Sequence, residues 1–105
     1  MTAHALSQDA ADHGYHVPRW AGAAPVEFVE WYPASFPEQR ARAQEWTCEH
    51  CLRTFYLMHG GGHAWIRRRV RADVRSKRVT TTDTERMSYA DARRLWQRIV
   101  LGRAR

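Results

Sequence analysis

The sequence has no long hydrophobic run, no signal-peptide pattern and only two cysteines. A membrane-spanning helix needs about 18 consecutive apolar residues, so none is predicted. The opening stretch MTAHALSQDAADHG has neither a cationic start nor an apolar centre, and we therefore expect a cytoplasmic protein. In that compartment two cysteines are more often free thiols or metal ligands than a disulfide.

Signatures of catalysis are also missing. No serine stands near an acid–base pair of the kind that nucleophilic catalysis requires. The triplet Gly60, Gly61 and Gly62 lacks the Lys-Ser/Thr pair of a P-loop and the strand–helix context of a dinucleotide fingerprint. We therefore expect a protein that is not an enzyme.

Length and composition indicate one small domain. The chain has 105 residues, of which 44% are apolar, and five tryptophans help to fill a core. Residues 1–24 show no sustained periodicity and are punctuated by glycine and proline. We predict a flexible tail over residues 1–24 and a single domain over residues 25–105.

Positive charge is concentrated in the second half of the chain. The net charge is +6, yet residues 1–50 hold three basic and seven acidic side chains, whereas residues 51–105 hold fourteen basic and four acidic ones. Arginine outnumbers lysine, and its planar fork of donors suits phosphate groups. The pattern favours a nucleic-acid partner, but an arginine-rich surface that only keeps the protein soluble explains it equally well.

A β-hairpin around the three glycines, over residues 54–71, organises the predicted fold. Two runs rich in aromatic and β-branched residues flank the glycines. With all three glycines in the loop, the expected cross-strand pairs are His59 with His63, Leu57 with Trp65, and Phe55 with Arg67. Side chains alternate along a strand, so one face is mostly apolar (Ala64, Ile66, Arg68, Val70, Ala72) and the other is basic (His63, Trp65, Arg67, Arg69, Arg71).

The remaining elements complete a small α+β fold. We predict a short strand over residues 26–32, a helix from Pro37 to Trp46, and a third antiparallel strand over residues 79–84. A C-terminal helix is expected between the N-cap Ser88 and Gly102. Its apolar stripe (Ala92, Leu95, Trp96, Ile99, Val100) should pack on Ile66, Val70 and Val74 of a three-stranded antiparallel sheet.

Cys48-Glu-His-Cys51 is the one motif that indicates a specific chemistry. Two thiolates separated by two residues can hold one zinc ion, which needs four nitrogen or sulfur ligands. His13 and His16 have the matching spacing, so we predict that any zinc uses Cys48, Cys51, His13 and His16. His50, inside the motif, is a further candidate.

Other interpretations of the cysteines and histidines stay open. A redox CxxC is less favoured, because the strand–CxxC–helix context of thioredoxins is missing, and two free thiols are the simplest alternative. His59 and His63 would complete a shortened zinc finger, but an extended strand places His59 about 26 Å from Cys51. As a cross-strand pair these two histidines could instead chelate a metal, flank a phosphate or simply be solvated.

The hairpin and the C-terminal helix resemble a group of small uncharacterised actinobacterial proteins from Streptomyces-type genomes. The shared pattern is a GG-x-x-aromatic-Ile-Arg-Arg run followed by a Leu-Trp helix, matched here by Gly61, Gly62, Trp65, Ile66, Arg67, Arg68, Leu95 and Trp96. The resemblance covers roughly the C-terminal half of the chain. It implies the same fold and a bacterial cytoplasmic setting, and it assigns no functional residue.

The function expected from these features is that of a small nucleic-acid-binding or regulatory accessory protein, stabilised by zinc. Arg67, Arg69 and Arg71 on the basic hairpin face would contact phosphates, and Trp65 would stack on a base. The alternative is a protein-interaction module whose same face binds an acidic protein partner. No membrane partner is expected.

Overall fold

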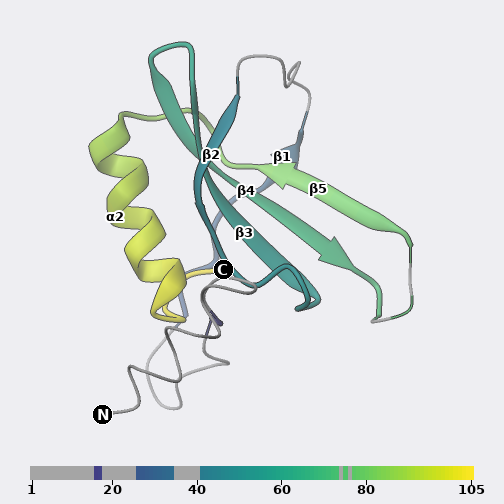
Figure 1. Cartoon of the computed structure of the whole chain (residues 1–105). Helices are drawn as coiled ribbons and strands as arrows, with labels where there is room; N and C mark the ends of the chain where they lie inside the picture. Colours follow the sequence, from purple (N-terminus) through teal and green to yellow (C-terminus); the bar gives the residue numbers. More distant parts are fainter. Residues whose placement is uncertain (1–15, 18–25, 35–40, 74, 76) are drawn as a thin grey trace.

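The protein folds as one antiparallel sheet with a C-terminal helix packed against it (Figure 1). The computed structural model describes residues 16–17, 26–34, 41–73, 75 and 77–105. The strand order is β1-β5-β4-β3-β2. The elements are β1 (Tyr32–Pro33), β2 (Arg42–Trp46), β3 (Arg53–Gly60), β4 (His63–Arg71), β5 (Val79–Asp83) and helix α2 (Tyr89–Val100).

The α+β class and the C-terminal helix are confirmed, but the predicted three-stranded sheet is wrong. The three expected strands correspond to β3, β4 and β5, and the short edge strands β1 and β2 extend the sheet to five. Within the described ranges, no helix has the length and apolar character needed to cross a membrane.

The hairpin turns through two glycines rather than three. Gly61 and Gly62 have φ angles of +60° and +81°, which a two-residue type I′ turn requires at both central positions. Gly60 pairs with His63 as the last rung of the ladder. The predicted pairing of His59 with His63 is therefore wrong.

This difference of one residue changes which side chains share a face. Leu57 pairs with Ile66, and Phe55 pairs with Arg68. Because side chains alternate along a strand, a slip of one residue moves a whole strand's pattern to the other face. Phe55 and Leu57 therefore lie with Ile66 on the apolar face and not, as predicted, beside Trp65 on the basic one.

Helix α2 covers this apolar face, which we call the helix face. The buried cluster between helix and sheet comprises Phe55, Leu57, Ala64, Ile66, Ala92, Leu95, Trp96, Ile99 and Ala104. The predicted packing of the helix stripe on Ile66 is confirmed, whereas Val70 is only half-buried and Val74 lies outside the described residues. Trp31 packs at the edge of the cluster, with its ring centroid 6.1 Å from that of Phe55.

The ends of α2 follow the local sequence signals. The Ser88 hydroxyl accepts a hydrogen bond from the Asp91 N–H at 3.1 Å, which caps the first turn. Gly102 has a φ of +75°, the left-handed conformation that commonly ends a helix. Both predicted boundary residues therefore act as expected.

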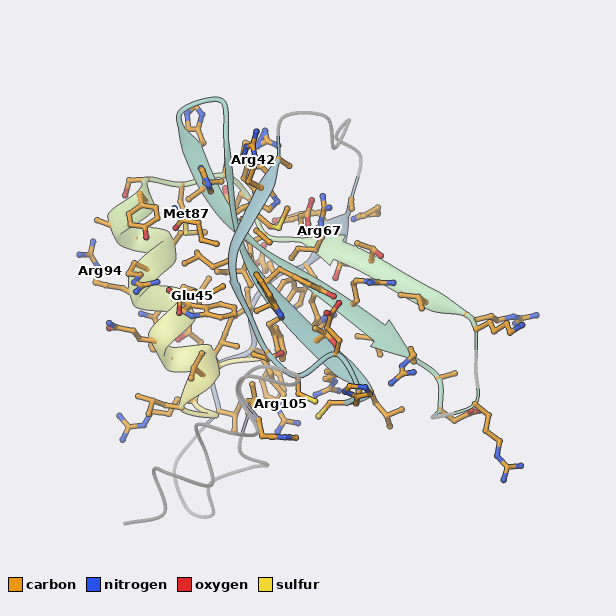
Figure 2. The ribbon with its side chains drawn as sticks, viewed as in Figure 1. Arg42, Glu45, Arg67, Met87, Arg94 and Arg105 are labelled. Carbon is orange, nitrogen blue, oxygen red and sulfur yellow. The ribbon has the colours of Figure 1, made fainter. Side chains whose placement is uncertain are left out.

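Residues 42–46 form the edge strand β2, so the predicted helix is wrong here, and its first part lies largely outside the described residues. Alanine, glutamine and glutamate favour a helix locally, but pairing with β3 satisfies the backbone of this stretch and places Trp46 in the sheet. A bulge within β2 turns Glu45 towards α2 (Figure 2). There Glu45 accepts hydrogen bonds from Arg93 and, at 3.3 Å, from Trp96 Nε1.

The N-terminal part of the described chain is mostly irregular. Of the predicted strand over residues 26–32, only Tyr32 pairs in the sheet, and Glu27 makes an isolated bridge to Ala104. Pro33, which lacks an N–H donor, is tolerated because β1 lies at the edge of the sheet. Of the predicted tail, the structure describes residues 16–17, and Val17 packs against the core.

Candidate functional site

Cys48 and Cys51 lie at the two ends of a tight turn between β2 and β3, which we call the Cys turn (residues 48–51). The Cys51 N–H donates to the Cys48 carbonyl at 3.3 Å and closes the turn. Cys48 is 1% exposed, and its carbonyl also accepts from the Thr54 hydroxyl at 3.3 Å. The preceding Thr47 exchanges two hydrogen bonds of 2.9 Å with Phe55 of β3. The Cys turn is thus anchored to the sheet at its first residue.

His16 reaches this turn from the N-terminal segment. Its Nδ1 lies 3.7 Å from Cys51 Sγ, and one ligand atom each of His16, Cys48 and Cys51 lie within 4.8 Å of one another. A tetrahedral zinc ion with bonds of about 2.0–2.3 Å separates its ligand atoms by roughly 3.3–3.8 Å. This group could therefore hold a metal ion with small side-chain movements. His13, the fourth predicted ligand, lies outside the described residues.

His50 approaches the Cys turn from the side of Cys48. Its Nδ1 lies 3.9 Å from Cys48 Sγ, close to the separation of two ligands on one metal ion. The side chain is exposed, and it is not one of the three residues whose ligand atoms lie within 4.8 Å of one another. His59 and His63 stand at the glycine end of the hairpin and do not belong to the group that the described residues form.

Arg71, a predicted phosphate contact, is tied to the Cys turn. It is half-buried, and its Nη2 donates to the carbonyls of His50 at 2.9 Å and Cys51 at 3.2 Å. Burial raises the pKa of the Cys51 thiol, neighbouring Cys48 raises it further, and the positive charge of Arg71 lowers it. The net effect is a raised pKa of Cys51, and Arg71 acts against it by favouring the thiolate form, which is the form that binds a metal.

The face of the sheet turned away from α2, which we call the open face, carries a row of cross-strand partners. The register aligns one residue from each strand, in the order Tyr32, Asp83, Arg67, Tyr56 and Trp46. Directly paired residues project from the same face, so this row crosses the whole sheet. Tyr32 is 45% and Trp46 43% exposed, and Tyr56 is half-buried.

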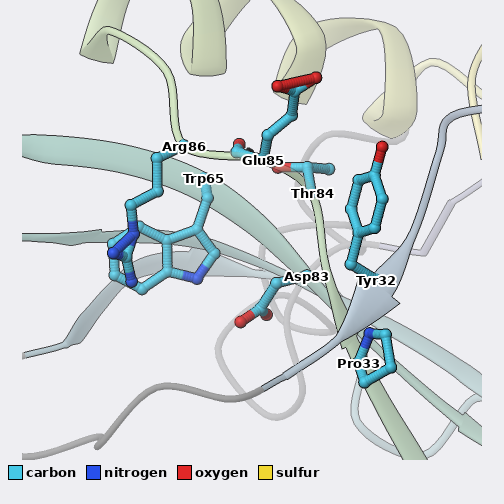
Figure 3. Close-up of a pocket in the computed structure, with 7 residues that line it drawn as sticks. All are labelled: Tyr32, Pro33, Trp65, Asp83, Thr84, Glu85 and Arg86. Atoms are coloured by element: carbon cyan, nitrogen blue, oxygen red, sulfur yellow. Dashed lines mark hydrogen bonds between the residues drawn. The ribbon is translucent and has the colours of Figure 1, made fainter.

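Two of the predicted nucleic-acid contacts lie on the open face but are buried, which corrects the expected exposure. Arg67 is 5% exposed, and its Nε and Nη2 donate to the Asp83 carboxylate at 2.8 and 3.1 Å. Trp65 is 2% exposed, and the guanidinium of Arg86 stacks over its ring at 4.2 Å (Figure 3). Alternation assigned both to the correct face, but it could not show that β5 and the following segment cover them.

Arg69 is the predicted contact that remains exposed on the open face. Its Nη1 donates to the Tyr56 hydroxyl at 3.3 Å, and that hydroxyl donates to Glu49 Oε2 at 2.8 Å. Burial raises the pKa of Tyr56, so the hydroxyl stays protonated and available as a donor at neutral pH. A hollow of about 460 Å³ lies here, lined by Ala43, Glu49, Tyr56, Met58, Arg67, Arg69 and Thr81.

A second hollow, of about 310 Å³, lies beside Asp83 and is lined by Tyr32, Pro33, Trp65, Asp83, Thr84, Glu85 and Arg86 (Figure 3). The Arg67–Asp83 pair therefore stands between two depressions of the same face. At the β1 edge of the sheet, the Tyr32 hydroxyl donates to Glu30 Oε2 at 2.7 Å, and this hydrogen bond raises the pKa of Tyr32.

No sequence pattern predicts a functional role for Tyr32, Tyr56 or Trp46. Their alignment depends on the pairing of distant strands, which no local pattern reports. One signal was nevertheless available, because a two-glycine loop places Tyr56 opposite Arg67.

Comparison with protein-family models, curated proteins and solved structures finds no match. The resemblance to actinobacterial proteins therefore stays a prediction.

Proposed function

We propose that this chain is a zinc-stabilised binding module in which Cys48, Cys51, His16 and His50 hold one Zn²⁺ ion. The observation that supports it is the convergence of one imidazole and two thiols within 4.8 Å. Thiolate sulfur and imidazole nitrogen suit zinc, whereas magnesium and calcium prefer oxygen ligands. A reducing cytoplasm, as expected from the sequence, would keep both thiols available.

His50 is our choice for the fourth ligand. A rotation of its exposed side chain, whose Nδ1 already lies 3.9 Å from Cys48 Sγ, brings it towards the centre of the other three groups. His13, the fourth ligand expected from the sequence, is the competitor. Four protein ligands leave no open position for a substrate, which is typical of structural zinc.

A closed zinc centre contributes to folding rather than to chemistry. It would fasten the N-terminal segment, through His16, to the turn between β2 and β3, and its binding energy would stabilise the fold. It would also hold the backbone carbonyls to which Arg71 donates. We therefore assign the chain a role in binding and not in catalysis.

Metal content tests the proposal. Native mass spectrometry should show one zinc per chain, and the variant Cys48→Ala/Cys51→Ala should carry none. His16→Ala and His50→Ala should each release zinc to a lower concentration of chelator than the wild type does. His59→Ala, a histidine at the far end of the hairpin, is the matched control and should behave as the wild type. Cobalt substitution should give the visible absorption of a tetrahedral thiolate site.

Two outcomes would change the assignment in different ways. A wild type that is folded but binds neither zinc nor cobalt contradicts the zinc centre. Zinc lost from His13→Ala but retained by His50→Ala shows that His13 is the fourth ligand and that His50 is not.

A further inference from the structure

Three partly exposed aromatic side chains share the cross-strand row of the open face. Trp46 and Tyr56 are direct partners on neighbouring strands, which lie about 4.8 Å apart. Tyr32 stands three strand spacings from Tyr56, or about 14 Å, at the other side of the sheet. Each ring is carried by a strand, so the sheet holds the three at set spacings.

Polar groups separate Tyr32 from the adjacent Trp46 and Tyr56. The Arg67–Asp83 ion pair lies between Tyr56 and Tyr32, and the Tyr56 hydroxyl is bonded to Glu49. The centre of a protein–protein interface is usually a contiguous apolar patch, which this row does not offer. A nucleobase combines an apolar face with polar edges, so it can stack on a ring and bond to the groups beside it.

An exposed cation borders the row, and carboxylates lie near it as well. Glu49 and Glu30 accept hydrogen bonds from the Tyr56 and Tyr32 hydroxyls, and Glu85 lines the hollow beside Tyr32. Arg69 is exposed next to Tyr56, whereas the Asp83 carboxylate is bonded to Arg67. The segment that joins β4 to β5 adds three exposed basic residues, Arg75, Lys77 and Arg78. The chain as a whole carries a net charge of +6, which favours association with a phosphate backbone.

We infer that the open face is a binding site for single-stranded nucleic acid. Trp46 and Tyr56 stack on neighbouring bases, Tyr32 stacks on a base further along the strand, and Arg69 contacts a phosphate. The hollow of about 460 Å³ lined by Tyr56 and Arg69 leaves room for a nucleotide there. A duplex keeps its base faces stacked inside, so the aromatic row selects single strands. This site lies in the sheet and does not rest on the zinc centre.

Fluorescence anisotropy with labelled oligothymidine at about 50 mM salt, where phosphate-driven binding is strong, tests the site. The single strand should bind more tightly than a duplex of equal length. Trp46→Ala should weaken binding about five-fold or more, the effect of losing one base-stacking contact. Arg69→Gln should lower the slope of log K against log salt by about 0.7, as expected for one phosphate contact on a single strand.

Matched controls come from α2, on the opposite side of the sheet. Tyr89 is 47% exposed, close to the exposure of Trp46, so Tyr89→Ala controls for the loss of an exposed aromatic ring. Arg94→Gln controls for the loss of one exposed charge. Both should bind oligothymidine as the wild type does. Trp46→Leu keeps apolar volume in β2 but has no ring on which a base can stack. It should weaken oligothymidine binding as much as Trp46→Ala does, and it serves as the test variant if Trp46→Ala fails to fold.

The inference is overturned if wild-type protein does not bind oligothymidine, or if it binds the duplex equally well. Equal effects of Arg94→Gln and Arg69→Gln would show diffuse attraction and no site. Tighter binding to labelled polyglutamate would show that the face recognises an acidic protein instead. Zinc measured on the same samples separates the two proposals, because zinc-free protein that still binds oligothymidine refutes only the zinc centre.

Discussion

The buried Arg67–Asp83 pair makes a large and specific prediction about stability. The two residues are 5% and 6% exposed and are joined by hydrogen bonds of 2.8 and 3.1 Å. Removing one partner of a buried pair leaves an uncompensated charge, which typically costs about 3–5 kcal/mol. We expect Arg67→Met and Asp83→Leu each to lower the free energy of unfolding by this amount.

The double variant should behave differently from the sum of its parts. Replacing a buried ion pair by apolar residues of similar volume is often neutral or stabilising. Arg67→Met/Asp83→Leu should therefore recover most of the stability that either single variant loses. This recovery distinguishes the cost of an unpaired charge from a general loss of packing at the centre of the open face.

Urea unfolding of the wild type and the three variants, at equal metal content, measures these differences as shifts of the midpoint. A loss of about 3 kcal/mol should also lower the melting temperature by about 12–24 °C in a domain of this size. The control is Arg98→Met, because Arg98 pairs with Glu27 at 2.9 Å with side chains 44% and 50% exposed. That change should cost less than about 1 kcal/mol, as usual for surface pairs.

Single variants that lose no more stability than the Arg98 control would show that Arg67 and Asp83 do not form a buried pair. The Arg67 side chain would then be accessible, as predicted from strand alternation, and would again be a candidate phosphate contact. A double variant no more stable than the singles would show that packing, and not the unpaired charge, sets the cost.

Two further predictions concern the sheet and helix. Leu95→Ala should lower the free energy of unfolding by about 2–5 kcal/mol, because Leu95 belongs to the buried cluster, while the exposed Gln97→Ala should cost far less in the same urea titration. Gly62→Ala should lower the free energy of unfolding by about 1–2 kcal/mol, measured in thermal melts. The cost comes from backbone strain alone, because the φ of Gly62 is +81° and no atom lies within 4 Å of the added Cβ. An unchanged stability would contradict the two-residue turn.

The C-terminal helix could be predicted because all its signals are local. Ser88 stands next to the first turn, Leu95 and Ile99 mark the buried stripe, and Gly102 follows the last turn. Each signal acts within one or two turns of the residue that carries it. Nothing elsewhere in the chain had to be known to place this element.

Pairing between strands could not be predicted to the same extent. The register depends on the exact length of the loop, and the choice of partner strand depends on residues far apart in the sequence. Counting Gly60 in the loop shifted the expected register by one and moved Phe55 and Leu57 to the wrong face. The local helix propensity of residues 42–46 was overridden by hydrogen bonds to β3. The open-face row, which needs four strand pairings at once, was therefore out of reach of the sequence.

Local spacing predicts some of the contacts around the candidate metal ligands but not the role of Arg71. Cys48 and Cys51 are recognisable from their spacing, and His16, 35 residues from Cys51, was found because its own spacing to His13 matches a metal site. Sequence alternation placed Arg71 among the phosphate contacts, yet its guanidinium is bonded to two carbonyls of the Cys turn. Arg71 therefore links the Cys turn to β4, the strand that also carries Arg69.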